Sequence, residues 1–337
     1  MILYRELEYF GILKQKINNC AILSVSNLSI ESILSKSREI GNALFPDKTL
    51  FKLCKDRYSL GGETLVNLNS LKFYLWNDNF CNNQEHKDKF VRSATYYVLF
   101  CCLIDKILDS KTVSNDKKSL VLTQFNRDCY ELILNGEYPG LDYGLDYMEV
   151  DDILNTLAFW LSNSFKYLKK FDAEQQKKII ENALKAYDSE FYVSTSRLVT
   201  PDSVDISLLT NKATCFVQSA FQMGAFDAIN KTHMDEVAYS IAKLFWFTDD
   251  ICDLYEDIRD ERKNSLLFAY SPTFYSIESA IDRIIYNIDD YFEYVTKCLL
   301  ELKNELSEEL YMFILAETWD WLVSINKNYS KAYRHLR

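Results

Sequence analysis

The chain of 337 residues has few of the residues that interrupt regular secondary structure, with only eight Gly and four Pro. A shortage of turn formers, together with many Leu, Ile, Lys and Glu residues, favours an all-α protein. Hydrophobic residues make up 48% of the chain and charged residues 26%, so a sizeable core can be buried. Neither a shift in composition nor an internal repeat marks a boundary, so we expect one helical domain over residues 1–337.

Other absences exclude further classes of protein. The nine Cys residues include no CxxC pair and only three His are present, so we do not expect a zinc site. An odd number of cysteines fits free thiols in a reducing compartment. The net charge of −11 argues against nucleic acid as the main partner. The chain shows no signal-peptide pattern at its start and no apolar run of about 18 residues, so we expect a cytoplasmic protein without a membrane span.

The spacing of apolar residues predicts a series of helices. Residues 1–45 are expected to be helical but irregular, with apolar residues at helical spacing over 30–44. The other expected ranges are 63–80, 89–110, 114–135, 151–170, 173–194, 206–228, 234–262, 274–304 and 307–333. Residues 46–48 and 59–62 are expected breaks, and residues 82–89 and 137–148 are expected loops. Asp172 is a predicted N-cap for the helix that begins at Ala173.

The stretch from Phe245 to Lys263 begins apolar and then becomes acidic. Asp249, Asp253 and Asp257 are spaced four residues apart, so on a helix they form one column, with Asp250 beside it. Like charges stacked one turn apart destabilise a helix unless something positive lies between them. Magnesium, which pairs carboxylates with substrate phosphates, would satisfy this column.

A second acidic pair ends the apolar helix predicted over 89–110. Asp105 and Asp109 are also four residues apart. The C-terminal end of a helix disfavours anions, and bare carboxylates beside an apolar surface are costly. The two side chains therefore either emerge into solvent where the helix ends or face a cation, and the sequence leaves both possibilities open.

These residues together resemble the class I isoprenoid synthase superfamily, which comprises the trans-prenyl diphosphate synthases and the terpene cyclases that share their fold. Asp249-Asp-Ile-Cys-Asp253 is similar to the second DDxxD motif of the synthases, and Lys263 follows where that family keeps a lysine. The segment 211–225, with Lys212 near its start and Gly-Ala at its end, resembles the family's Lys-Thr helix. Asp105-Lys-Ile-Leu-Asp109 resembles a degenerate first aspartate motif, and it lies 144 residues before Asp249.

The resemblance implies a fold, a cofactor and roles for particular residues. It implies a single-domain helical bundle with a central active-site cavity and roughly three Mg²⁺ ions. Ligands of these ions would be Asp105, Asp109, Asp249, Asp250, Asp253 and Asp257. Lys212, Lys263 and Arg197 would bind the substrate diphosphate. Asp105, Asp249 and Lys212 would carry the catalytic step.

Departures from the synthase pattern indicate which reaction is retained. No Arg pair follows the first motif, Lys106 stands where the family has Asp, and Gly61-Gly62 is followed by Glu63-Thr64 in place of a Lys-Arg pair. A site for one allylic diphosphate is therefore expected to be kept, and a site for a second diphosphate to be lost. This pattern is similar to that of terpene cyclases acting on a linear prenyl diphosphate of roughly 15 to 25 carbons.

Such a reaction needs a cavity that keeps a carbocation away from water, and aromatic faces stabilise cations. The aromatic residues near the motif helices are Tyr97, Phe100, Phe216, Phe221, Phe245 and Trp246. For any single one of them, ordinary core packing is the more common explanation.

Two alternatives to a cyclase stay open. The chain could be a prenyltransferase that elongates or attaches a prenyl chain, or a non-catalytic helical subunit, as Lys106 could suggest. Homodimers are common in the superfamily that the chain resembles, so a homodimer is possible here too.

Overall fold

In a computed structural model of the chain, the structure describes residues 2–20, 27–54, 63–109, 113–138, 149–195, 206–259, 264–265 and 277–334. These residues contain fourteen helices and no strand, which confirms the predicted all-α fold. The helices are α1 (Ile2–Asn19), α2 (Asn27–Leu44), α3 (Thr49–Leu53), α4 (Glu63–Phe80), α5 (Lys87–Asp109), α6 (Asn115–Gln124), α7 (Arg127–Leu134), α8 (Glu149–Leu168), α9 (Ala173–Thr195), α10 (Ile206–Gly224), α11 (Lys231–Arg259), α13 (Ile277–Tyr286), α14 (Ile288–Glu305) and α15 (Glu308–Arg334).

Two of the predicted helices are divided in the structure. The helix predicted over 114–135 is wrong as a single element, because Asn126 caps a new helix by accepting a hydrogen bond from the Cys129 N–H at 2.9 Å. The helix predicted over 274–304 is also wrong as one element. It divides at Asn287, whose Nδ2 donates to the Arg283 carbonyl at 2.8 Å and so satisfies the end of α13. Short polar side chains that bond to nearby backbone compete with helix continuation at both points.

The predicted cap at Asp172 is confirmed. Its Oδ1 atom accepts hydrogen bonds from the backbone N–H groups of Glu174 and Gln175, both at 3.0 Å. Lys231 donates to the other carboxylate oxygen at 2.5 Å. This hydrogen bond is the main reason that the pKa of Asp172 is lowered from its ordinary value.

The described chain divides into two compact units. Unit 1 comprises residues 1–30, 188–215 and 239–337, and unit 2 comprises residues 31–187 and 216–238. The boundaries between them fall inside α2, α9, α10 and α11. The single domain expected from the sequence stays a prediction.

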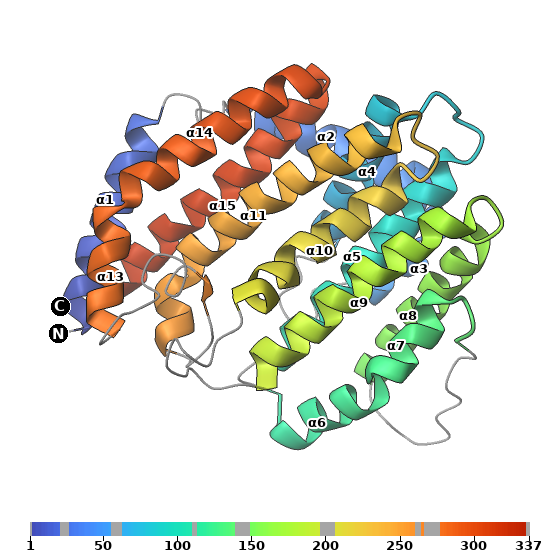
Figure 1. Cartoon of the computed structure of the whole chain (residues 1–337), viewed down its shortest axis with the longest axis horizontal. Coiled ribbons are helices and arrows are strands. Elements are labelled where there is room, and N and C mark those ends of the chain that lie inside the picture. The colour runs from blue at the N-terminus through green and yellow to red at the C-terminus, as the bar shows by residue number, and fades with distance from the viewer. Residues whose placement is uncertain are drawn as a thin grey trace. The chain divides into compact units, whose positions relative to one another are not determined.

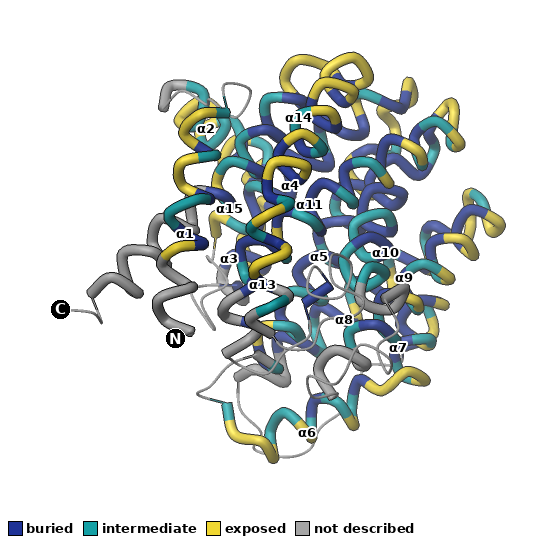
Figure 2. The backbone as a smooth tube through the Cα atoms, turned by 60° about the vertical axis from the view of Figure 1, so that its left-hand side comes forward, coloured by how far each residue is buried: buried dark blue, intermediate teal, exposed yellow. Residues whose placement is uncertain are grey.

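Unit 2 is built around α5. This helix packs against α4 on one side and α8 on another, and α7 packs on α8 (Figure 1). Most of α5 is buried, whereas much of α6 is exposed (Figure 2). Two side chains of α4 donate hydrogen bonds to the α10 backbone, Trp76 to the Phe221 carbonyl at 2.9 Å and Asn77 to the Gly224 carbonyl at 2.8 Å. These bonds fix the packing of α4 on the C-terminal half of α10.

Unit 1 holds the acidic part of α11. In this unit α1 packs against α13 and α15, and α14 packs against α15 (Figure 1). The hydroxyl of Tyr9, which is fully buried, donates to the Ile251 carbonyl at 2.7 Å. The N-terminal helix therefore contributes directly to the backbone packing of the acidic segment.

All nine cysteines lie in the described residues, and none of them forms a disulfide. None of the helices that the structure describes has the length and apolar content to cross a membrane.

Candidate functional site: the acidic face of α11

The last turns of α11 separate an apolar side from an acidic side. Ile251 and Leu254 are buried, as the preceding Phe245 is, and they anchor the helix in the core of unit 1. Asp249 is exposed and Asp253 is partly buried, one turn further along. The side that carries Asp249, Asp250, Asp253 and Asp257 is called the acidic face below.

Asp250 has a carboxyl group whose pKa is far above its ordinary value. Its pKa is raised from 3.8 to about 8, mainly because the group is buried. The charges of Asp249 and Asp257 also raise the pKa, while a hydrogen bond from Ser265 and the charge of Lys212 lower it. The Ser265 hydroxyl donates to Asp250 Oδ2. At neutral pH, therefore, most of the Asp250 carboxyl groups hold a proton.

Asp257 accepts a hydrogen bond from Asn264, the residue directly before Ser265. It is 9% exposed, and its Oδ2 atom accepts a hydrogen bond from Asn264 Nδ2 at 3.0 Å. Asn264 Nδ2 also donates to the Asp250 carbonyl at 2.7 Å. Asn264 and Ser265 thus contact two turns of the acidic face at once.

Lys212, the predicted diphosphate ligand, lies in α10 within electrostatic range of Asp250. Its Nζ atom is 3.0 Å from Glu190 Oε2 of α9, and the two side chains are 36% and 21% exposed. Lys212 and the acidic face therefore belong to the same unit, and the charge of Lys212 acts on Asp250. The role of Lys212 in diphosphate binding stays a prediction.

The other predicted ligands are placed differently. Asp105 lies near the end of α5 in unit 2 and is partly buried, and Asp109 is the last residue of that helix. The side chain of Asp109, and the whole of Arg197 and Lys263, lie outside the described residues. The pairing of Asp105 with Asp249 across a cavity stays a prediction.

The six aromatic residues predicted to line a cavity have clear packing partners. In unit 2, the Tyr97 ring lies 5.5 Å from Phe216, the Phe100 ring lies near Phe125 and Tyr130, and the Phe221 ring packs on Phe73 and Trp76. In unit 1, the Phe245 ring lies 4.9 Å from Trp321, and the Trp246 indole N–H donates to Ser265 Oγ at 2.8 Å. Phe216 is partly buried and the other five are buried. Their role in lining a cavity stays a prediction.

The carboxylate oxygens of the acidic face are possible ligands of a metal ion. Within the described residues, no three or more His, Cys, Asp or Glu side chains are grouped as they would be around a metal ion. Magnesium is usually held by one or two carboxylates together with substrate phosphates and water rather than by a complete protein cage. Asp249 and Asp253, one turn apart, could supply two such carboxylates, so the residues of this face fit magnesium.

Three residues that contact the predicted site residues were not predicted from the sequence. Asn264 and Ser265 hold Asp250 and Asp257, and Glu190 pairs with Lys212. The only signal for the first two was a polar Asn-Ser pair placed directly before the apolar run 266–268. Nothing in the spacing of Glu190 distinguishes it from an ordinary exposed helix residue.

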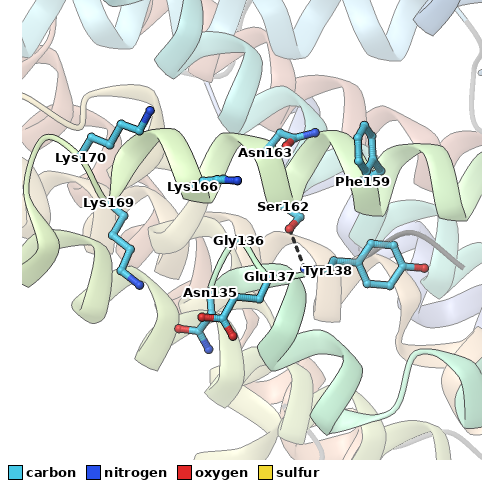
Figure 3. Close-up of a pocket in the computed structure, with 10 residues that line it drawn as sticks. All are labelled: Asn135, Gly136, Glu137, Tyr138, Phe159, Ser162, Asn163, Lys166, Lys169 and Lys170. Carbon is cyan, nitrogen blue, oxygen red and sulfur yellow. Dashed lines mark hydrogen bonds between the residues drawn. The ribbon is translucent and has the colours of Figure 1, made fainter.

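A separate surface pocket of about 720 Å³ lies in unit 2 between α8 and the residues that follow α7 (Figure 3). Gly136 lies against α8 there, with a φ of +75°, and the Tyr138 N–H donates to Ser162 Oγ at 3.1 Å. Lys166, Lys169 and Lys170 line the pocket, but their side chains extend in different directions (Figure 3). The pocket therefore does not concentrate positive charge on one point.

Comparisons with known proteins do not assign a function to the chain. No family model matches the chain, and no curated protein matches it. Among solved structures, the chain is similar to the crystal structure of geranylgeranyl pyrophosphate synthetase from Pyrococcus horikoshii, with a TM-score of 0.47 and 14% identity. The match covers 88% of this chain and 98% of that one. An identity of 14% at this TM-score does not indicate a function.

Proposed function

We propose that the chain is a magnesium-dependent terpene cyclase of class I, which ionises one linear prenyl diphosphate and releases pyrophosphate. The observation that carries the proposal is the placement of Lys212 within electrostatic range of the acidic face of α11. Carboxylates and a lysine at one place suit a magnesium–diphosphate group, because the carboxylates bind the ion and the lysine binds phosphate oxygens. The lack of an Arg pair after Asp109 supports one diphosphate site rather than two.

In the proposed reaction, the bond between the allylic carbon and the diphosphate oxygen breaks, and the electron pair leaves with that oxygen. Magnesium, when bound, supplies Lewis-acid stabilisation of the leaving group. The Lys212 ammonium would donate hydrogen bonds to the same oxygens, and Glu190 would hold the lysine in place before substrate enters. Cyclisation of the allylic cation and loss of a proton would complete the reaction.

The product assay tests this proposal directly. The full chain is incubated with Mg²⁺ and farnesyl or geranylgeranyl diphosphate, with and without isopentenyl diphosphate, and both organic products and pyrophosphate are measured. A cyclic hydrocarbon or alcohol without isopentenyl diphosphate supports the cyclase. A longer diphosphate formed only with isopentenyl diphosphate would replace it with a prenyltransferase.

Variants make the assay specific to the acidic face. Asp249→Ala should abolish pyrophosphate release, whereas Asp88→Ala, at an exposed aspartate in the first turn of α5, should retain it. Full turnover by Asp249→Ala would refute the proposed role of the face. The absence of any product, with no magnesium-dependent binding of a bisphosphonate, would favour a non-catalytic subunit instead.

A further inference from the structure

Asn264 and Ser265 are almost fully buried polar residues that contact α11 at three places. They are 0% and 2% exposed. Asn264 Nδ2 donates both to the Asp250 carbonyl and to Asp257 Oδ2, at 2.7 and 3.0 Å. Ser265 donates to Asp250 Oδ2 and accepts from the Trp246 indole N–H at 2.8 Å. We call this pair of residues the clamp.

The clamp determines how the two carboxyl groups are oriented. Trp246 lies one turn before Asp250 on α11, so its indole N–H fixes Ser265 Oγ beside the Asp250 carboxyl. Asn264 joins Asp250 to Asp257 two turns later through a single amide group. In each carboxyl group the Oδ2 atom is engaged by the clamp, which sets the plane of the group and the direction of its other oxygen.

Burial makes this orientation well defined. Trp246 is 8% exposed and Asp257 is 9% exposed, so four of the five residues in this network are buried and have little freedom to adopt other rotamers. A buried Asn or Ser that lost its partner would leave an unsatisfied polar group, which opposes rearrangement. The clamp is therefore suited to hold the acidic face in one arrangement before any ligand arrives.

We propose that Asn264 and Ser265 are positioning residues, which fix Asp250 and Asp257 so that the acidic face binds a divalent cation and a diphosphate in one geometry. This inference rests on the proposed function for its ligand, and on the hydrogen bonds of Asn264 and Ser265 to α11 for its geometry. Partners that orient metal-binding side chains typically change metal affinity or activity 10–100-fold when they are removed.

The first test measures the clamp without any ligand. Hydrogen–deuterium exchange of peptides from the last turns of α11 is compared between the metal-free wild-type protein, Ser265→Ala and Asn264→Ala. Faster exchange is expected in residues 250–259, and exchange in α14 should be unchanged. Ser70→Ala and Asn69→Ala are matched controls, because these residues are equally buried but bond within their own helix, α4. Unchanged exchange in α11 would overturn the proposal, whether or not the protein acts on a prenyl diphosphate.

The second test measures ligand binding rather than turnover. Binding of inorganic pyrophosphate in the presence of Mg²⁺ is measured by calorimetry, and binding of Mn²⁺ by electron paramagnetic resonance. Ser265→Ala should weaken pyrophosphate binding by roughly tenfold, and Ser265→Thr should restore most of it because the hydroxyl is kept. Binding equal to the wild-type protein in folded Ser265→Ala and Asn264→Ala would overturn the functional part of the inference. If the wild-type protein itself binds no magnesium pyrophosphate, the proposed function fails, and with it the diphosphate role of the clamp, while the exchange experiment still decides its structural role.

Discussion

Lys212 Nζ and Glu190 Oε2 lie 3.0 Å apart and join α10 to α9 beside the acidic face of α11. The pair is partly exposed, so water screens it and its net contribution to stability is small, about 0–1 kcal/mol. The ion pair orients the lysine, and breaking the pair costs little free energy. Under the proposed function, Lys212 would exchange its carboxylate partner for the oxygens of a diphosphate.

Variants of Lys212 and Glu190 should differ in how tightly they bind magnesium pyrophosphate. Lys212→Met should weaken binding of magnesium pyrophosphate by roughly 10- to 100-fold, because a charge-assisted donor is lost. Glu190→Gln should bind it at least as tightly as the wild-type protein, because the competing carboxylate is removed. Both variants should change the free energy of unfolding by less than about 1 kcal/mol in urea titrations. Equal weakening of binding in both variants would contradict the prediction.

The raised pKa of Asp250 predicts how stability depends on pH. Its pKa is about 8 in the folded protein, against an ordinary value of 3.8. Between these values the folded state keeps a proton that the unfolded chain has released, so the free energy of unfolding falls as pH rises from about 4 to about 8. Asp250→Asn removes this contribution, and at pH 8.5 it should be more stable than the wild-type protein by roughly 1–3 kcal/mol.

Urea unfolding in EDTA across this pH range measures the difference. The advantage of Asp250→Asn should shrink towards pH 5, where the wild-type carboxyl is protonated in the folded state. Asp88→Asn, at an exposed site, should follow the wild-type curve. A constant offset between Asp250→Asn and the wild-type protein at all pH values would count against the raised pKa.

The same carboxyl group predicts a proton release on ligand binding. A bound cation favours the charged form of a neighbouring carboxyl, so it lowers the pKa of Asp250. At pH 7, binding of Mg²⁺ with pyrophosphate should therefore release up to about one proton from the wild-type protein, and less from Asp250→Asn. Calorimetry in buffers of different ionisation enthalpy counts these protons. Equal release from both proteins would show that Asp250 does not respond to the ligand.

Two glycines predict opposite effects of the same substitution. Gly136 has a φ of +75°, and a Cβ atom there would lie 2.8 Å from the Lys166 backbone, so Gly136→Ala should destabilise the protein by roughly 1–3 kcal/mol. Gly11 lies within α1, and a Cβ atom there meets nothing within 4 Å. Gly11→Ala should therefore stabilise by roughly 0.5–1 kcal/mol. Thermal unfolding of both variants measures these effects. If Gly136→Ala stabilised the protein, Gly136 would not lie close to the α8 backbone.

The helices could be predicted from local information to a large extent, because apolar spacing reports which face of a segment is buried. The division of the predicted helices at Asn126 and Asn287 was missed. Asn126 caps the start of α7 and Asn287 caps the end of α13, each through a hydrogen bond between its side chain and nearby backbone. Such a bond competes with helix continuation without disturbing the apolar spacing. The cap at Asp172 was found because it coincided with the start of an apolar pattern.

The sequence by itself determined that the chain is helical and that Asp249, Asp250, Asp253 and Asp257 occupy one end of a long helix, since spacing along one helix is a local property. Only the tertiary structure decided that the pKa of Asp250 is raised by burial, and that Asn264 and Ser265 donate hydrogen bonds to this residue. The reason is physical: desolvation and hydrogen bonding depend on residues from other segments that pack against the helix. Their positions follow from the packing of the whole unit rather than from any pattern along the chain.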